Sequence, residues 1–148
     1  MMTGGEGVSK ILVGVGGSEY SEKAFKLACI IAAKCNAGLL IVNFEVLGRE
    51  GSVSFDLSKK ATQELEKGGN IPLLERCRSE AKDAGIIDVQ TLTTSGHAAE
   101  MILRIADLEG ADMIVLGRRG LNALKEFLLG SVSYNVSHHT KCPVVIAR

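Results

Sequence analysis

Short apolar segments that alternate with helical segments constrain the fold of this chain more than any other feature. Runs rich in Ile, Leu and Val cover residues 10–15, 39–44, 113–116 and 144–147. Runs without polar alternation are typical of strands in a parallel sheet that helices cover on both faces. Residues 89–94 alternate in polarity and predict a further strand with a more exposed, edge-like position. The pattern predicts a single-domain, three-layer α/β sandwich around a five-stranded parallel sheet.

The segments between these runs carry helix signals. Ser18 is the predicted N-cap of the first helix, and Gly38 is its predicted stop. Apolar residues at helical spacing predict later helices at residues 98–108 and 131–139. Each predicted helix therefore leads from one strand to the next.

The middle of the chain is less regular. Mixed polarity at residues 45–56 predicts a loop or lid over one end of the sheet. Residues 58–84 have helical composition, but residues 68–72 read Gly-Gly-Asn-Ile-Pro, and Gly85 closes the segment. Two helices are preferred here over one interrupted helix, because paired glycines followed closely by proline destabilise a helix interior.

Length and charge narrow the possible classes of protein. The chain has 148 residues, enough for one domain, which we expect to span residues 10–148 after a flexible tail at residues 1–9. Seventeen basic residues balance seventeen acidic ones, whereas nucleic-acid surfaces usually carry a basic excess. No apolar run is long enough to span a membrane, and no signal peptide pattern opens the chain. We therefore expect neither a nucleic-acid partner nor a membrane.

Four cysteines bear on the cellular compartment. Cys29, Cys35, Cys77 and Cys142 form no C-x-x-C pair and have no neighbouring histidine at metal-ligand spacing. We interpret them as reduced core thiols and not as a disulfide framework. Reduced thiols indicate a reducing compartment, so we expect a cytoplasmic protein.

Three spaced glycines follow the strand at residues 113–116. They are Gly117, Gly120 and Gly130, and Ser131 then opens the helix that leads to the last strand. Ser131 is a candidate N-cap, and the free N–H groups of a helix start favour a bound phosphate. Arg119 could add a charged donor to phosphate oxygens. The alternative interpretation is a plain glycine-rich turn.

This spacing reproduces the nucleotide-binding pattern of the universal stress protein family. Gly117, two residues, Gly120, nine residues, then Gly130 and Ser131 match that pattern, and the chain resembles the family from Lys10 to Ala147. The resemblance implies a Rossmann-like sheet with strand order 3-2-1-4-5. It also implies ATP or a related adenine nucleotide as ligand, with or without magnesium, and a homodimer formed through the C-terminal edge strand. In that strand order, the loops after strands one and four face one crevice, where ligands of open α/β sheets bind.

The resemblance also implies which residues contact the nucleotide. Phosphates are expected at the glycine loop and at the helix start, and the nucleoside between the ends of the first two strands. The predicted nucleotide-binding residues are Val15, Gly16, Phe44, Leu116, Gly117, Arg119, Gly120, Gly130, Ser131, Val132 and Ser133.

Two of these positions carry open questions. Many family members have an aspartate after the first strand that contacts the nucleoside, whereas this chain has Gly16. Loss of that carboxylate predicts weaker binding or a different ligand. Phe44 could stack on adenine or could be an ordinary core residue.

The histidines do not predict catalysis. His138 and His139 are adjacent and would point about 100° apart on a helix, so they cannot easily share one metal. His97 has no evident partner. We therefore expect at most slow ATP hydrolysis, and no dedicated enzyme.

Three functions are compatible with the sequence. The leading one is an ATP-binding universal stress protein with a regulatory role in the stress response. The second is a dimeric interaction module of the same fold that has lost nucleotide binding, which Gly16 motivates. The third is an enzyme that uses the glycine loop to bind a phosphorylated substrate, although the sequence offers no dedicated catalytic cluster for it.

Overall fold

The computed structural model describes residues 7–16, 18–45, 71–118 and 130–148. Regular elements alternate between strand and helix along most of this part of the chain, as the sequence predicts. In order, they are β1 (Lys10–Val15), α1 (Glu19–Cys35), β2 (Gly38–Glu45), α3 (Ile71–Asp83), β3 (Val89–Ser95), α4 (Ala98–Glu109), β4 (Met113–Gly117), α5 (Ser131–His139) and β5 (Val144–Ala147). The predicted loop at residues 45–56 and the first of the two helices expected at residues 58–84 fall almost wholly outside the described residues.

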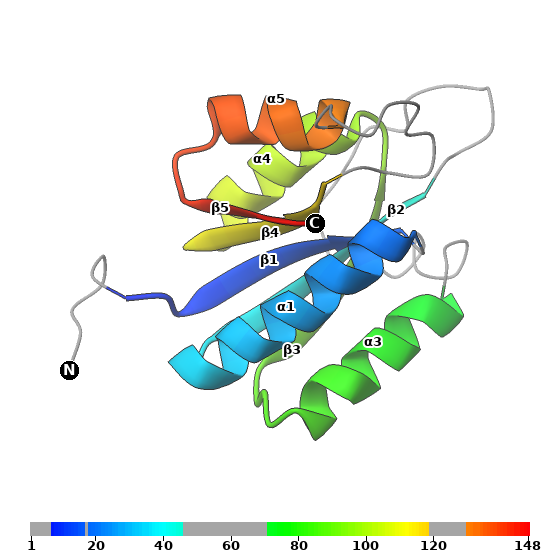
Figure 1. Cartoon of the computed structure of the whole chain (residues 1–148), viewed down its shortest axis with the longest axis vertical. Coiled ribbons are helices and arrows are strands. Elements are labelled where there is room, and N and C mark those ends of the chain that lie inside the picture. Colours follow the sequence, from blue (N-terminus) through cyan, green and yellow to red (C-terminus); the bar gives the residue numbers. More distant parts are fainter. Residues whose placement is uncertain (1–6, 17, 46–70, 119–129) are drawn as a thin grey trace.

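The strands form one parallel sheet in the order β3-β2-β1-β4-β5, which confirms the predicted topology. Helices α1 and α3 cover one face of the sheet, and α4 and α5 cover the other (Figure 1). The carboxyl ends of the strands and the N-termini of α1, α4 and α5 lie at the same end of the molecule (Figure 1). Strands β1 and β4 are neighbours, so the sheet has its topological switch point between them.

The core consists of two apolar layers, one on each face of the sheet. Alternate residues of β1 enter different layers: Ile11 and Val13 pack against α1 and α3, whereas Leu12 packs against α4 and α5. All three side chains are fully buried. Burial on both faces explains why the sequence of β1 shows no polar alternation.

Helix α1 begins as predicted but ends differently. Ser18 is its N-cap, and the Ser18 hydroxyl accepts a hydrogen bond from the Ser21 amide. At the other end, Asn36 takes the left-handed C-cap conformation, with φ 55°. The predicted stop, Gly38, instead begins β2, where a Cβ would come 2.9 Å from the Asp88 carboxylate. Asparagine can adopt the left-handed conformation locally, so a glycine was not needed at the cap.

An ion pair ties α1 to α3. The guanidinium of Arg76 donates two hydrogen bonds to the Glu22 carboxylate, at 3.0 and 2.9 Å. The hydrogen bond from Arg76 lowers the pKa of Glu22 against the opposing effect of burial. Glu22 therefore joins the two helices that cover one face of the sheet, in addition to lying in the first turn of α1.

Strand β3 lies at an edge of the sheet, as predicted, but it is more buried than its alternating polarity indicates. Residues from Leu92 to Ser95 are all buried. Thr93 is fully buried, and its hydroxyl oxygen has no hydrogen-bond partner among the residues that the structure describes. Polar side chains here are therefore no sign of exposure, and the sequence prediction of an exposed strand is wrong for the carboxyl half of β3.

The Thr93 hydroxyl should contribute nothing favourable to stability. We expect Thr93→Val to leave the free energy of unfolding unchanged or to raise it by about 1 kcal/mol, because the isosteric change removes an unpaired buried hydroxyl. Thr94→Val is the matched control, since Thr94 is equally buried but its hydroxyl donates to the Ser95 carbonyl at 3.4 Å. Urea denaturation compares the two variants. A Thr93→Val protein less stable than Thr94→Val would contradict this prediction.

Candidate nucleotide site

The site lies at the carboxyl ends of β1, β2 and β4. Leu116 and Phe44 lie on either side of Gly14: a Cβ on Gly14 would be 3.1 Å from Leu116 Cδ2 and 3.6 Å from Phe44 Cε2. Leu116 and the half-buried Phe44 both pack on the α4 and α5 face of the sheet. The absence of a side chain at Gly14 thus lets these two residues approach each other near the switch point, where Leu116 is 4% exposed and Phe44 is the more accessible of the two.

Val15 does not share that surface. Its side chain is 3% exposed and belongs to the core layer beneath α1 and α3. Strand alternation places it on the face opposite Phe44 and Leu116. Of the predicted nucleotide-binding residues, the structure therefore places Phe44 and Leu116 on the same face of the sheet and turns the Val15 side chain, predicted with Phe44 to line the nucleoside, away from them.

Helix α5 begins at the same end of the sheet. Gly130 is its N-cap, and Ser131 is its first helical residue. The prediction that Ser131 caps the helix is therefore wrong by one position. A glycine has no side chain to accept from the first turn, and the helix has no side-chain cap hydrogen bond and no acidic residue in that turn. The first N–H groups of a helix have no intrahelical acceptor, so, as far as the described residues show, this N-terminus retains donors for an anion.

The N-terminus of α1, by contrast, is already occupied by its own side chains. Ser18 caps the Ser21 amide, and the Ser21 hydroxyl in turn accepts from the Gly16 amide at 3.2 Å. Glu19 and Glu22 add negative charge in the first turn. Between these two helix starts, α5 is therefore the one suited to an anion.

Hydrogen bonds hold the start of α5 against the end of β4. The Gly130 amide donates to the Arg118 carbonyl at 2.9 Å, and the Arg118 amide donates to Ala147 in β5 at 2.8 Å. The hydroxyl of Ser133 donates to the Gly117 carbonyl at 2.7 Å. Both ends of the glycine loop are thus anchored at the carboxyl ends of β4 and β5. The predicted residues Arg119 and Gly120 lie outside the described residues.

The structure gives a reason for glycine at position 117 that the sequence does not show. It does not adopt positive φ, but a Cβ there would lie 2.6 Å from the carbonyl carbon of Tyr20. The first turn of α1 therefore packs directly on this glycine. Residue 117 must therefore be glycine because the backbone of α1 approaches it closely, whether or not a ligand does so too.

Gly16 is exposed and has open space around it. A Cβ at this position would meet no atom within 4 Å, and its φ is not in the positive range. A side chain here would therefore cause neither a clash nor backbone strain. The position after β1 can accommodate an aspartate, although this chain has none.

The histidines lie at the C-terminal end of α5 and at the start of α4. His138 stacks on Tyr134 with ring centroids 5.8 Å apart, and His139 Nδ1 lies 2.9 Å from the Asn135 carbonyl. His97 is the N-cap of α4 and makes no side-chain cap bond. Among the residues that the structure describes, no group of three or more His, Cys, Asp or Glu side chains could hold a metal ion.

All four cysteines are free, but they are not all core residues. Cys29 and Cys77 are buried, and this burial raises the pKa of each thiol to about 11. Cys142 is half-buried, and Cys35 is exposed at the end of α1. The interpretation as core thiols is therefore wrong for Cys35, which is exposed.

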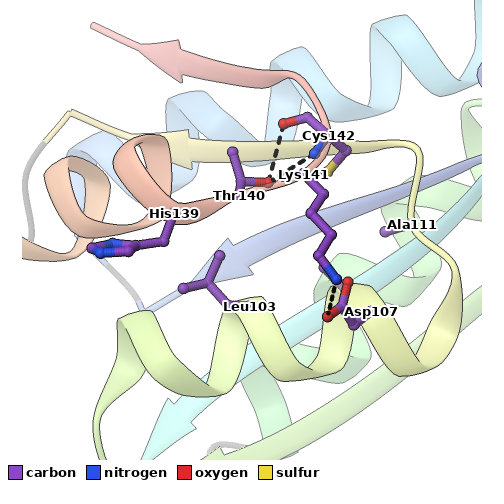
Figure 2. Close-up of a pocket in the computed structure, with 8 residues that line it drawn as sticks. Leu103, Asp107, Ala111, His139, Thr140, Lys141 and Cys142 are labelled. Carbon is purple, nitrogen blue, oxygen red and sulfur yellow. Dashed lines mark hydrogen bonds and ion pairs between the residues drawn. The ribbon is translucent and has the colours of Figure 1, made fainter.

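A cavity of about 220 Å³ lies away from this site, between α4 and the segment that joins α5 to β5 (Figure 2). Lys141 reaches across it to Asp107, with Nζ and Oδ2 3.5 Å apart. None of the predicted nucleotide-binding residues lines it. Its lining residues are Leu103, Ala106, Asp107, Ala111, His139, Thr140, Lys141 and Cys142.

The sheet order and the switch-point site define a Rossmann-like α/β protein. The model of the Universal stress protein family matches residues 7–148, and the chain belongs to that family. It is 34% identical over 151 aligned positions to universal stress protein YxiE of Bacillus subtilis, covering 95% of this chain and 99% of that protein. No helix in the described part of the chain is long and apolar enough to cross a membrane.

Solved structures resemble the chain closely. The universal stress protein UspA from Lactobacillus plantarum shares the fold, with a TM-score of 0.78 and 22% identity over 96% of this chain and 99% of that one. A universal stress protein in complex with cAMP has a TM-score of 0.70 and 29% identity, covering 97% of this chain and 98% of its own. That relative binds an adenine nucleotide on the same fold.

Proposed function

We propose that this protein binds ATP, or a related adenine nucleotide, as a regulatory ligand in the stress response. The observation that carries the proposal is the start of α5, which lacks a side-chain cap and lies beside the switch point of the sheet. The complex of a 29% identical family member with cAMP supports an adenine nucleotide as the ligand.

The phosphates bind to the backbone amides in the first turn of α5. Ser131 is exposed there, and no acidic side chain of that turn repels an anion. Gly120 and Arg119 complete the phosphate contacts from the glycine loop, and magnesium accompanies the triphosphate if a metal is needed. These contacts follow the physics of helix N-termini, which favour negative charge.

The nucleoside packs against the accessible part of Phe44, beside the buried side chain of Leu116. Phe44 is only half-buried, so part of its ring is free to contact a base. Val15 and Gly16 contribute backbone at the end of β1, since the Val15 side chain is in the opposite core layer. Gly16 offers no carboxylate, which makes the nucleoside contacts weaker than the phosphate contacts.

The protein acts in the cytoplasm as a homodimer that pairs through β5. This strand lies at the edge of the sheet and presents unpaired backbone groups there. Val144, Val145 and Ile146 are only half-buried along it, which supports a partner strand. Sedimentation equilibrium tests the dimer, and a monomer at micromolar concentration would contradict it.

The alternative is a dimeric interaction module without a nucleotide, for which Gly16 is the specific observation. One experiment separates the two functions. Protein purified without added nucleotide is denatured and its supernatant is analysed for adenine nucleotide, and fresh protein is titrated with ATP, with and without magnesium. We expect released nucleotide or saturable ATP binding. No release and no binding at millimolar ATP, which corresponds to about −4 kcal/mol, would favour the interaction module.

A further inference from the structure

We propose that Ser133 is a positioning residue of the nucleotide site: its buried hydroxyl fixes the first turn of α5 against the end of β4. The inference rests on the proposed function, because it concerns how the phosphate-binding amides are held. It changes the role of Ser133 from the predicted ligand contact to a residue that acts through the helix.

The contact of Ser133 explains this change of role. Its side chain is 3% exposed, and its hydroxyl donates to the Gly117 carbonyl at 2.7 Å. A serine hydroxyl has one proton to donate, and here that proton is committed to the strand. A phosphate at the helix start would therefore meet the backbone N–H groups and not this hydroxyl.

The acceptor belongs to a part of the sheet that is fixed from several sides. Gly117 packs against the backbone of Tyr20, and Arg118 is bonded to Ala147 in β5. The bond from Ser133 thus fastens the third residue of α5 to a rigid strand end. Without it, the bond from the Gly130 amide to the Arg118 carbonyl would be the remaining hydrogen bond between the helix start and the end of β4 among the described residues.

Placement matters because the amides bind an anion only when several of them point at it together. The favourable field of a helix N-terminus falls off within its first turn. Preorganised donors lose most of their advantage when they must reorganise around the ligand. Loss of the Ser133 hydroxyl should therefore weaken the binding of phosphate and leave the apolar nucleoside contacts unchanged.

Ser137 provides a matched control on the same helix. Its hydroxyl also donates to a backbone carbonyl, that of Ser133, at 2.6 Å. This bond stays inside α5 and does not reach the sheet. Ser137→Ala therefore removes a serine-to-carbonyl bond on the same helix, at an exposed position, without releasing the start of the helix.

The test compares ATP and adenosine affinities for the wild type, Ser133→Ala and Ser137→Ala. All titrations are done well below the lowest melting temperature measured by circular dichroism. We expect Ser133→Ala to lose about tenfold in ATP affinity, the equivalent of one buried hydrogen bond, with adenosine affinity almost unchanged. Ser137→Ala should keep the wild-type ratio of the two affinities.

A purely structural role of Ser133 would lower the melting temperature and leave this affinity ratio unchanged. The isosteric pair Ser133→Thr and Ser133→Val gives a second comparison, in which threonine should keep the ratio and valine should lose it. If the wild type prefers ATP but Ser133→Ala retains the full ratio, the positioning role is overturned while the proposed function stands. If the wild type binds ATP no more tightly than adenosine, the phosphate contacts at α5 and the positioning role both fail. If it does not bind ATP at all, the proposed function itself fails.

Discussion

Gly117→Ala is expected to lower the free energy of unfolding by about 2 to 3 kcal/mol, at the upper end of what added core methyl groups cost. The new Cβ would lie 2.6 Å from the carbonyl carbon and 2.7 Å from the carbonyl oxygen of Tyr20. These are backbone atoms in the first turn of α1, so no side-chain rotation can relieve the clash. The helix or the end of β4 must move.

Gly16→Ala is the matched control for this change, and urea denaturation measures both variants. The added methyl group at Gly16 meets no atom within 4 Å, so we expect its effect on stability to stay within about 0.5 kcal/mol. A Gly117→Ala protein as stable as Gly16→Ala would mean that α1 does not pack on Gly117 as described.

Gly16→Asp is expected to tighten ATP binding about ten- to a hundredfold. The substitution introduces the carboxylate that the family resemblance leads us to expect after the first strand, and a hydrogen bond to a charged group contributes about 1.5 to 3 kcal/mol. The open space at Gly16 admits the side chain without strain, and the bond from its amide to Ser21 is unaffected because it is a backbone donor. Isothermal titration with ATP measures the gain.

Gly16→Ala again serves as the control, because it adds a side chain without a carboxylate. An affinity for ATP that is the same in Gly16→Asp, Gly16→Ala and the wild type would show that this position lies out of reach of the ligand. It would remove Gly16 from the site without touching the phosphate contacts at α5.

The sheet could be predicted because its strands are apolar on both sides. Burial on both faces requires unbroken runs, and such runs at residues 10–15 and 113–116 match β1 and β4 closely. Helix starts with a side-chain signal were also predictable, as the cap at Ser18 shows. The strand order came from resemblance, because periodicity does not say which strands are neighbours.

The details that the sequence did not reveal depend on contacts between distant residues. Ser131 resembles a cap, but the cap is Gly130, whose backbone is extended and whose carbonyl accepts from the Tyr134 amide at 2.9 Å. Gly117 looks like a loop glycine, yet its neighbour is Tyr20, almost a hundred residues earlier in the chain. Local patterns carry no information on such packing.

The sequence predicted which residues line the candidate site, and the structure shows where some of their side chains lie. Phe44 and Leu116 do meet at the switch point, whereas the side chain of Val15 belongs to the opposite core layer. Strand alternation could have shown this, since Val15 and Val13 point to the same face of β1. The contacts of Arg119 and Gly120 with a nucleotide stay predictions.

The most direct test of the central claim is an NMR titration of ¹⁵N-labelled protein with ATP and with adenosine. The claim is that phosphates bind to the backbone amides at the start of α5. We expect ATP to shift the amide signals of Ser131, Val132 and Ser133 strongly, while adenosine shifts signals near Phe44 and Leu116 and leaves those three almost unchanged. Saturating ATP that leaves the amides at the start of α5 unshifted would contradict the claim.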